Sequence, residues 1–367
     1  MKLPWFHRRS IDPQPLADCN AVLLTADIAG LGQADVVLGA KYHSDETGQR
    51  REGEIVWYRH GTWERHVIGL GQLEAGGVAL PLGGGGRIDL VAGEEGKGRN
   101  LFWWENPGHK GGDPRRPWLR RLITNGFERY HDQAAGDVDG DGRAELVVLS
   151  QNAGKLVYFD VPADPRVEPW PAACCHVVAD DVVLEGLAVA DLDGNGANEI
   201  LAGHLIFRPP TPRRRTWQRA QLVPDFRWAR VAVADLNGDG CPDIVLAESE
   251  CPGARLVWVE GPAFKKVHPL GDDFSHLHSL AVADFNGDGH PDIFTAEMQL
   301  PNNGAPRIVL FLNDGQGKFF RHEIDNAGGT HESRLIHLAG SRLPSILIKP
   351  YAPHSRLELL ENVTPVG

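Results

Sequence analysis

The chain contains 367 residues, of which 42% are hydrophobic, and 37 basic against 49 acidic residues give it a formal net charge of −12. No apolar run is long enough to cross a membrane, and no basic stripe of the kind that nucleic acid requires is present. The composition therefore predicts a single domain that interacts with neither membranes nor nucleic acid.

The N-terminal segment MKLPWFHRRS lacks the apolar core of a signal peptide, and the five cysteines are odd in number and follow no spacing pattern. These features predict a cytoplasmic protein with free thiols. Secretion after removal of a leader is the alternative.

The same N-terminal segment predicts a β-strand. It places Trp5 close to Arg8, a pattern that returns at Trp63 and Trp118, where a fourth strand of a repeat is expected. The C-terminus, in contrast, stops after a third strand. We therefore expect residues 1–12 to supply the outer strand of the last repeat and so to close a ring.

Three degenerate hairpin repeats are legible in the chain. Residues 21–39 have the pattern of two strands joined by a turn, but the apolar Ala29 and Leu31 occupy turn positions where the clearer repeats described next have side chains with oxygen atoms. Residues 78–93 and 335–349 keep the strands and lose the acidic turn altogether. These loops are expected to be free of metal.

Four further repeats lie between residues 93 and 335, and they have nearly the same sequence motif. They read GDVDGDGRAELVV from Gly136, ADLDGNGANEILA from Ala190, ADLNGDGCPDIVLA from Ala234 and ADFNGDGHPDIFTA from Ala283. An apolar strand turns through a Gly-rich acidic loop and resumes as an apolar strand, so each unit is a hairpin that presents carboxylates at its tip.

Oxygen donors occupy the first, third, fifth and ninth places of each acidic loop, a set that suits calcium better than zinc or magnesium. The predicted ligands are Asp137, Asp139, Asp141 and Glu145; Asp191, Asp193, Asn195 and Glu199; Asp235, Asn237, Asp239 and Asp243; and Asp284, Asn286, Asp288 and Asp292. About four structural calcium ions are therefore expected. An EF-hand is excluded, because Val148 and Thr295 stand at the twelfth place, where that motif needs a bidentate Glu.

The repeat spacing predicts an all-β fold, a single seven-bladed β-propeller of four-stranded blades. The blades are expected at about 20–69, 76–124, 130–179, 184–224, 228–270, 276–325 and 331–365, with residues 1–12 closing the last one. No second domain is needed.

On these repeats, the chain resembles the FG-GAP or VCBS-type family of calcium-loop β-propellers over essentially its whole length. The segment NLFWWENPG at 100–108 is also similar to a segment of the fungal aldos-2-ulose dehydratase and related sugar eliminases. The first resemblance implies a calcium-stabilised propeller, and the second implies dehydration chemistry on a sugar.

The candidate site lies on the rim opposite the acidic loops. If each loop joins the innermost strand to the second, the starts of the inner strands and the turns after the second strands share the other rim. Acid, base and imidazole groups concentrate there and differ from blade to blade, which favours an active site over an ordinary polar rim. The residues expected there are Lys41, Tyr42, His43, Glu94, Glu95, Tyr130, His131, Asp132, Gln151, Asn152, Glu185, His204, Arg227, Trp228, Arg230, Glu248, Glu250, His276, His278, Glu297, His331, Glu332, Arg334, Lys349, Tyr351 and His354.

The reaction predicted for this rim is β-elimination on a keto-sugar, keto-glycoside or uronate. No nucleophile elbow, phosphate loop or dinucleotide fingerprint is present, which argues against acyl, phosphoryl and hydride transfer. His131 or His278 is expected to act as base, Arg230 or a His-bound divalent metal such as zinc to hold the enolate, and Glu185 or Tyr351 to assist. The predicted substrate-binding residues are Tyr42, His43, Arg227, Trp228, Glu248, His276, Glu297 and His331.

Two alternatives remain open at this stage. A glycoside hydrolase would use two rim carboxylates, for example Glu185 with Glu248. A non-catalytic calcium-stiffened scaffold would bind a glycan or protein through Trp228, Arg227 and Tyr42. The expected partner is a sugar or oligosaccharide, and the sequence leaves the oligomeric state open.

Overall fold

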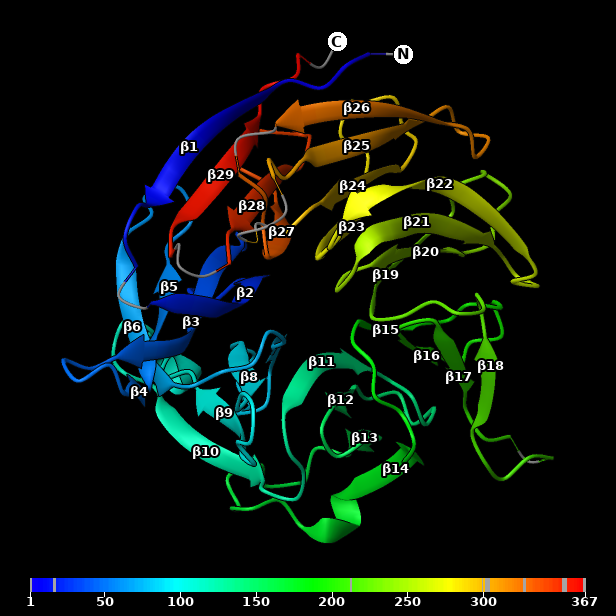
Figure 1. Ribbon diagram of the computed structural model, residues 1–367. Helices are drawn as coiled ribbons and strands as arrows, with labels where there is room; N and C mark the ends of the chain where they lie inside the picture. Colours follow the sequence, from blue (N-terminus) through cyan, green and yellow to red (C-terminus); the bar gives the residue numbers. More distant parts are fainter. Residues whose placement is uncertain are drawn as a thin grey trace.

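The computed structural model describes residues 2–15, 18–211, 213–298, 300, 304–325, 328–351 and 355–365. Seven antiparallel sheets surround a central axis like the blades of a propeller (Figure 1). The predicted seven-bladed all-β propeller is confirmed. Within the described residues, no helix combines the length and the apolar character that a membrane crossing requires.

The blades follow chain order, and each runs from an inner to an outer strand. Blade 1 contains β2 (Cys19–Ala26), β3 (Asp35–Ser44), β5 (Gly53–Tyr58) and β6 (Arg65–Gly71), with the short β4 (Arg50–Arg51) paired to β3; blade 2 contains β7 (Val78–Leu80), β8 (Asp89–Gly93), β9 (Leu101–Glu105) and β10 (Leu119–Thr124); blade 3 contains β11 (Tyr130–Gly136), β12 (Glu145–Ser150), β13 (Lys155–Phe159) and β14 (Cys175–Ala179). Blade 4 contains β15 (Leu187–Ala190), β16 (Glu199–Ala202), β17 (Leu205–Arg208) and β18 (Gln218–Gln221); blade 5 contains β19 (Ala229–Ala234), β20 (Asp243–Glu248), β21 (Pro252–Glu260) and β22 (Lys266–Ser275). Blade 6 contains β23 (Ser279–Ala283), β24 (Asp292–Ala296), β25 (Ile308–Asn313) and β26 (Phe319–Asp325); blade 7 contains β27 (Glu332–Ile336), β28 (Ser345–Lys349), β29 (Leu357–Asn362) and β1 (Phe6–Asp12). Two short 3₁₀ helices, η1 (His109–Gly111) and η2 (Ala172–Cys174), lie in the outer loops of blades 2 and 3.

Hydrophobic packing between neighbouring blades forms the core. Six of the seven second strands, β20 among them, are buried along their entire length. One cluster joins Val245 and Trp258 of blade 5 to Ile293 and Phe311 of blade 6. Each such buried side chain stabilises the fold by about 1.5–3 kcal/mol. The blades are therefore held by their neighbours, and the ring must close for the first and last blades to be covered.

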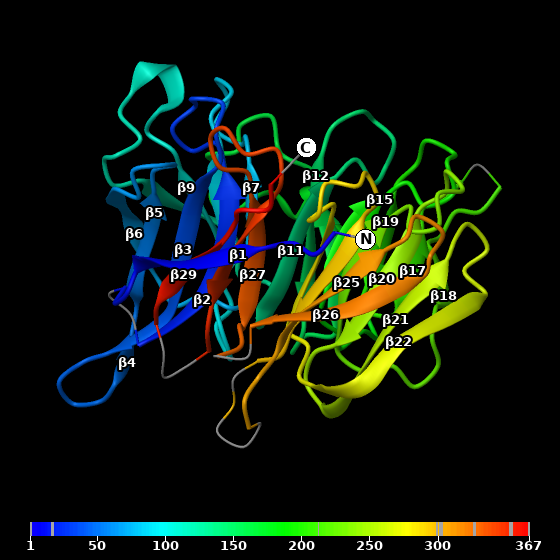
Figure 2. The ribbon, with the colours of Figure 1, turned by 90° about the horizontal axis from the view of Figure 1, so that it is seen from above.

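Closure of the ring comes from the N-terminal strand, as predicted. Strand β1 pairs antiparallel with β29, so Phe6 lies opposite Asn362 (Figures 1 and 2). Arg8 forms an ion pair with Glu358 at 2.7 Å. Phe6 packs edge-on against Phe285 of blade 6, at 6.4 Å between ring centroids. Trp5, which the sequence pattern singles out, is instead 68% exposed.

The inner strands approach one another so closely at the axis that certain positions admit only glycine. A Cβ atom at Gly186, where φ is +81°, would lie 2.0 Å from the carbonyl oxygen of Ala229 on the next blade. A Cβ atom at Gly76 would lie 2.3 Å from the carbonyl oxygen of His131. These contacts set how tightly the starts of the inner strands converge, and so determine the geometry of the site.

Substitutions at the closing strand test this account. Phe6→Ala removes the contact that joins β1 to blade 6 and is expected to lower the free energy of unfolding by about 1–2 kcal/mol. Trp5→Ala, its exposed neighbour, is expected to cost less than about 0.5 kcal/mol. Chemical denaturation of both variants measures the difference. Equal losses would contradict the assignment of Phe6 as the closing contact.

Candidate functional site

The four acidic loops connect the innermost strand of a blade to its second strand. In blade 3, the Asp137 carboxylate accepts hydrogen bonds from the backbone N–H groups of Gly140 at 2.7 Å and Gly142 at 2.8 Å. Asp235 accepts the equivalent bonds in blade 5, at 2.8 and 2.9 Å. Both glycines of blade 3 have φ near +85°, which explains why the repeat requires glycine there.

The carboxylates of these loops are close enough to share a cation. Ligand oxygens of Asp137, Asp139 and Glu145 lie within 4.8 Å of one another, as do those of Asp191, Asp193 and Glu199. In the fourth loop, burial together with the charges of the Asp288 and Asp284 carboxylates raises the pKa of Asp292 to about 7. A divalent cation would relieve this repulsion, so the acidic clusters are consistent with calcium sites.

The ninth carboxylate also has a structural role that the sequence reading missed, where it is an Asp. Asp243 accepts hydrogen bonds from the backbone of Leu236 in its own loop, at 2.9 Å, and of Gly261 beyond the third strand, at 2.8 Å. Asp35 does the same with Ala29 and His60, both at 2.8 Å, although its loop keeps only Asp27 of the other three donors. This carboxylate therefore fastens the loop to the blade in repeats with and without the complete set of donors.

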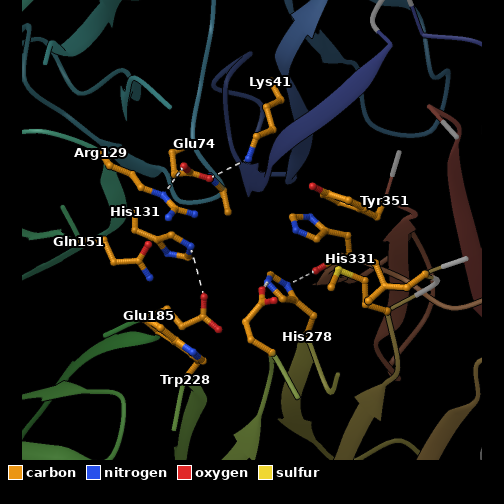
Figure 3. Close-up of a pocket in the computed structure, with 14 residues that line it drawn as sticks. Lys41, Glu74, Arg129, His131, Gln151, Glu185, Trp228, His278, His331 and Tyr351 are labelled. Carbon is orange, nitrogen blue, oxygen red and sulfur yellow. Dashed lines mark hydrogen bonds and ion pairs between the residues drawn. The ribbon is translucent and has the colours of Figure 1, made fainter. Parts of the chain in front are cut away.

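An axial pocket of about 430 Å³ opens where the inner strands begin (Figure 3). It draws its lining from six of the seven blades and the segments between them. The lining residues are Lys41, Glu74, Ala75, Arg129, His131, Gln151, Glu185, Trp228, Glu250, His278, Met298, Leu300, His331 and Tyr351. The structure thus brings together nine residues that the sequence places on this rim: Lys41, His131, Gln151, Glu185, Trp228, Glu250, His278, His331 and Tyr351.

His131 and its two acidic neighbours form one wall of the pocket. His131 Nδ1 lies 2.7 Å from Asp132 Oδ2, and its Nε2 lies 3.3 Å from Glu185 Oε2. Burial alone would lower the pKa of His131, but the Asp132 and Glu185 carboxylates outweigh it and raise that pKa above its ordinary value. The Asp132 carboxylate also accepts a hydrogen bond from the backbone N–H of Gly186 at 3.0 Å, so its position is fixed.

Arg230 lies beneath the pocket, within a network of charges. Its guanidinium contacts Asp132 at 3.3 Å and Glu332 at 3.2 Å, and its Nη2 lies 2.9 Å from His278 Nδ1. It lines a smaller cavity further along the axis, of about 220 Å³, rather than the pocket itself. Arg230 was predicted to hold the enolate, but it lies outside the pocket lining, and of the three side chains that it contacts only His278 lines the pocket.

His278 and His331 stack at the opposite wall, with ring centroids 4.2 Å apart. His278 Nδ1 lies 2.6 Å from the carbonyl oxygen of His331, and its Nε2 lies 3.1 Å from Glu250. Tyr351 covers the other face of His331 at 4.9 Å. One ligand atom each from Glu185, Glu250 and His278 lies within 4.8 Å of the other two, so these side chains present a mixed oxygen and nitrogen donor set.

Two lining residues, Glu74 and Arg129, were missed in the sequence reading. Glu74 is almost fully buried and accepts from Lys41 at 3.0 Å and from Arg129 at 2.9 Å. Burial opposes its ionisation, but the charges of Lys41, His131 and Arg129 lower the pKa of Glu74 to about 2. A signal existed, because Glu74 stands seven residues before the turn at Pro81, as Trp228 does before Asp235.

Several predicted binding residues have other surroundings. Glu248 pairs with Arg255 at 2.8 Å and Glu297 with Arg307 at 2.6 Å, where they cap the turns after the second strands. Both carboxylates hold turns within their own blades and lie outside the pocket lining. The remaining four also lie outside that lining: Tyr42 under Arg50, His43 near Asp18, the exposed Arg227, and His276 beside Ser275. His354 falls outside the described residues.

Comparison with known proteins agrees with this architecture. A model of FG-GAP-like repeats matches residues 235–295, which span the third acidic loop and most of the fourth repeat hairpin. A search of curated proteins gives no significant match. Among solved structures, the chain is similar to the crystal structure of the V. cholerae biofilm matrix protein Bap1, with a TM-score of 0.53 and 11% sequence identity over 96% of this chain and 89% of that one. At this identity the likeness shows the fold alone.

Calcium titration tests the acidic loops. Isothermal calorimetry on the chelator-treated protein is expected to give about four sites, as the four donor sets predict. Asp139→Ala removes a third-place donor and should lower the stoichiometry by one. Asp314→Ala is the matched control, because Asp314 likewise caps backbone N–H groups of an exposed turn but belongs to no acidic loop. An unchanged stoichiometry for Asp139→Ala would refute the assigned ligand set.

Proposed function

We propose that the axial pocket is the active site of a carbon–oxygen lyase that eliminates across a C–O bond of a keto-sugar, keto-glycoside or uronate. The observation that carries this proposal is the Asp132–His131 pair, buried in the pocket wall with a Nδ1–Oδ2 distance of 2.7 Å. A carboxylate on Nδ1 holds the proton there and leaves Nε2, on the side of Glu185, as the base.

The chemistry needs a base, an acid and a group that holds negative charge. His131 Nε2 removes the proton next to the substrate carbonyl, and the electron pair moves onto the carbonyl oxygen as an enolate. When the enolate collapses, the C–O bond to the leaving group breaks, and an acid protonates the departing oxygen. Glu185, 3.3 Å from His131, and Tyr351 across the pocket are the groups that assist.

The charges of the lining favour a neutral sugar over a uronate. Glu74, Glu185 and Glu250 bring three carboxylates to the pocket. Lys41 and Arg129, the two permanent cations of the lining, are both bonded to Glu74. A carboxylate on the substrate would therefore find no uncommitted cation among the lining residues, whereas a keto-sugar offers only hydroxyl and carbonyl groups. We therefore place keto-sugars and keto-glycosides ahead of uronates.

A divalent metal such as zinc would fit the donor set of Glu185, Glu250 and His278. His278 Nδ1 lies 2.6 Å from a backbone carbonyl, a second-shell contact typical of metal-bound histidines, but Nε2 lies 3.0 Å from Arg230 Nη2, so this guanidinium would have to move before Nε2 could hold the ion. Such an ion, when bound, would polarise the substrate carbonyl. The Asp132–His131 pair would keep its role as base in either case.

Glycan binding without turnover is the second candidate function, and one observation favours it. Trp228 and Tyr351 place two half-buried aromatic rings at the pocket, a common way to hold a sugar ring. The hydrolase alternative would use Glu185 with Glu250 instead of Glu248, because Glu250 lines the pocket together with Glu185, whereas Glu248 is paired with Arg255 outside it.

An absorbance assay separates these functions. Incubation with a panel of keto-sugars, keto-glycosides and uronate oligosaccharides, with and without added zinc, is expected to give new ultraviolet absorbance from a conjugated enone on the keto substrates. Reducing sugar released without such absorbance would support the hydrolase. Binding by calorimetry with no product of either kind would support the glycan-binding function.

The role of His131 can be tested by substitution. His131→Gln keeps a polar side chain of similar size and should lower kcat/KM by about 10²-fold or more, because it removes the base. His7→Gln in the exposed face of β1 is the matched control and should leave kcat/KM unchanged. Circular dichroism checks that both variants fold. Retained turnover in His131→Gln would exclude His131 as the base.

The pH profile provides a further test. Because the base must be neutral and the pKa of His131 is raised, kcat/KM should rise with pH through an apparent pKa above the ordinary histidine value of about 6.5. Asp132→Asn removes a carboxylate that raises this pKa and should move the rise to lower pH, while Asp314→Asn should not. A rise that begins well below pH 6, or that ignores Asp132→Asn, would contradict the assignment.

A further inference from the structure

Lys349, the last residue of β28, carries an ammonium group that is completely buried beside the pocket. Its Nζ donates hydrogen bonds to the carbonyl oxygen of Asn20 at 2.9 Å and to Nδ1 of His331 at 2.8 Å. The side chain does not line the pocket itself, so Lys349 reaches the pocket only through His331. A buried ammonium is costly, and its placement here needs a reason.

His331 is held in one orientation from several sides. His278 stacks on it at 4.2 Å with 18° between the ring planes, and Tyr351 lies 4.9 Å away on blade 7. Its backbone carbonyl accepts from His278, and its backbone N–H donates to the Lys349 carbonyl at 2.8 Å. The imidazole is 5% exposed, so the contacts leave the ring little freedom to turn.

The charged groups around His331 are mainly cationic. Lys349, Arg230 and Lys41 face it, and His278 is its stacking partner. Burial, followed by the nearby ammonium of Lys349, keeps the pKa of His331 well below its ordinary value. The groups that face Lys349 in turn are Glu332, Cys19, Lys41 and Arg334. The 2.8 Å contact itself requires a neutral ring, because a protonated Nδ1 would point its N–H at the ammonium of Lys349.

A neutral imidazole carries one proton, and the contact with Lys349 decides which nitrogen holds it. An ammonium group can only donate, so the Nδ1 atom that faces it must be the acceptor. We propose that Lys349 is a positioning residue that holds His331 as the Nε2–H tautomer, so that His331 donates a hydrogen bond to the carbonyl oxygen of the substrate.

This inference rests on the proposed function, because it gives His331 the task of holding the enolate oxygen. His131 and His331 stand on opposite sides of the pocket (Figure 3), so a sugar between them would meet a base on one side and a donor on the other. A neutral imidazole keeps its proton as the enolate forms and hydrogen-bonds to it throughout. No proton is transferred from His331 in this step.

Nitrogen NMR at pH 7 tests the tautomer without any substrate. The protein is labelled with ¹⁵N in its histidines, and the His331 signals are identified as those lost in His331→Gln. The expected spectrum shows a protonated Nε2 and an unprotonated Nδ1. Lys349→Met should shift these signals toward a mixture of tautomers, whereas Lys41→Met, a matched change at the other lysine near the pocket, should leave the His331 tautomer as it is.

The wild-type spectrum decides the question even if Lys349→Met fails to fold. A protonated Nδ1 on wild-type His331 would overturn the proposal, as would a folded Lys349→Met variant with an unaltered His331 spectrum. On a keto-sugar that the wild type converts, a folded Lys349→Met variant should lower kcat by on the order of 10–100-fold with little change in KM. An unchanged kcat would also overturn it.

Failure of the inference and failure of the proposed function give different results. If the enzyme turns over a keto-sugar but His331 has the other tautomer, the lyase stands and the role of Lys349 falls. If His331 has the expected tautomer but no substrate of the panel is converted, the positioning by Lys349 stands and the lyase falls.

Discussion

Seven sheets packed around one axis oblige seven inner strands to begin in the same small space, and the polar side chains that start them must satisfy one another there. Arg230 of blade 5 illustrates the constraint, since it bonds Asp132 of blade 3 and Glu332 of blade 7 at 3.3 and 3.2 Å. An unpaired charge at this depth would cost several kcal/mol. Closing the ring therefore also requires that charges at the axis be paired, and the residues that pair come from blades far apart in the sequence.

The same pairing gives chemically identical side chains different properties. His131 lies between the Asp132 and Glu185 carboxylates, which favour its protonated form, and His331 lies beside the Lys349 ammonium, which favours its neutral form. When two histidines have environments that shift their pKa values in opposite directions, one site acquires both a base and a hydrogen-bond donor. The division of roles in the pocket follows from which charge each blade supplies.

The rim that carries the acidic loops is built from repeated backbone contacts. There the Gly-rich loops keep the same backbone hydrogen bonds, and an Asp at the ninth place, as at Asp35 and Asp243, also fastens its loop to the backbone beyond the third strand. Calcium at four of these loops would add stability to a frame that already folds by blade packing. One rim of the molecule therefore consists of loops that repeat from blade to blade, whereas at the other rim each blade contributes different side chains.

The sequence by itself determined the architecture, because the repeated hairpins with their alternating apolar runs have one closed arrangement, and because the N-terminal strand had a matching vacancy in the last blade. It also determined which rim would hold the polar groups, since that follows from strand direction alone. Which of those groups face one another was decided only by the tertiary structure. Glu248 and Glu297 are as acidic as Glu185 and Glu250, but arginines of their own blades, Arg255 and Arg307, bind them. Glu74 stands in a segment without a motif, and Lys349 ends the degenerate repeat 335–349, so their contacts with Arg129 and His331 emerged only in the tertiary structure. A repeat fixes local geometry within one blade, whereas distances across the axis depend on how all seven blades pack together.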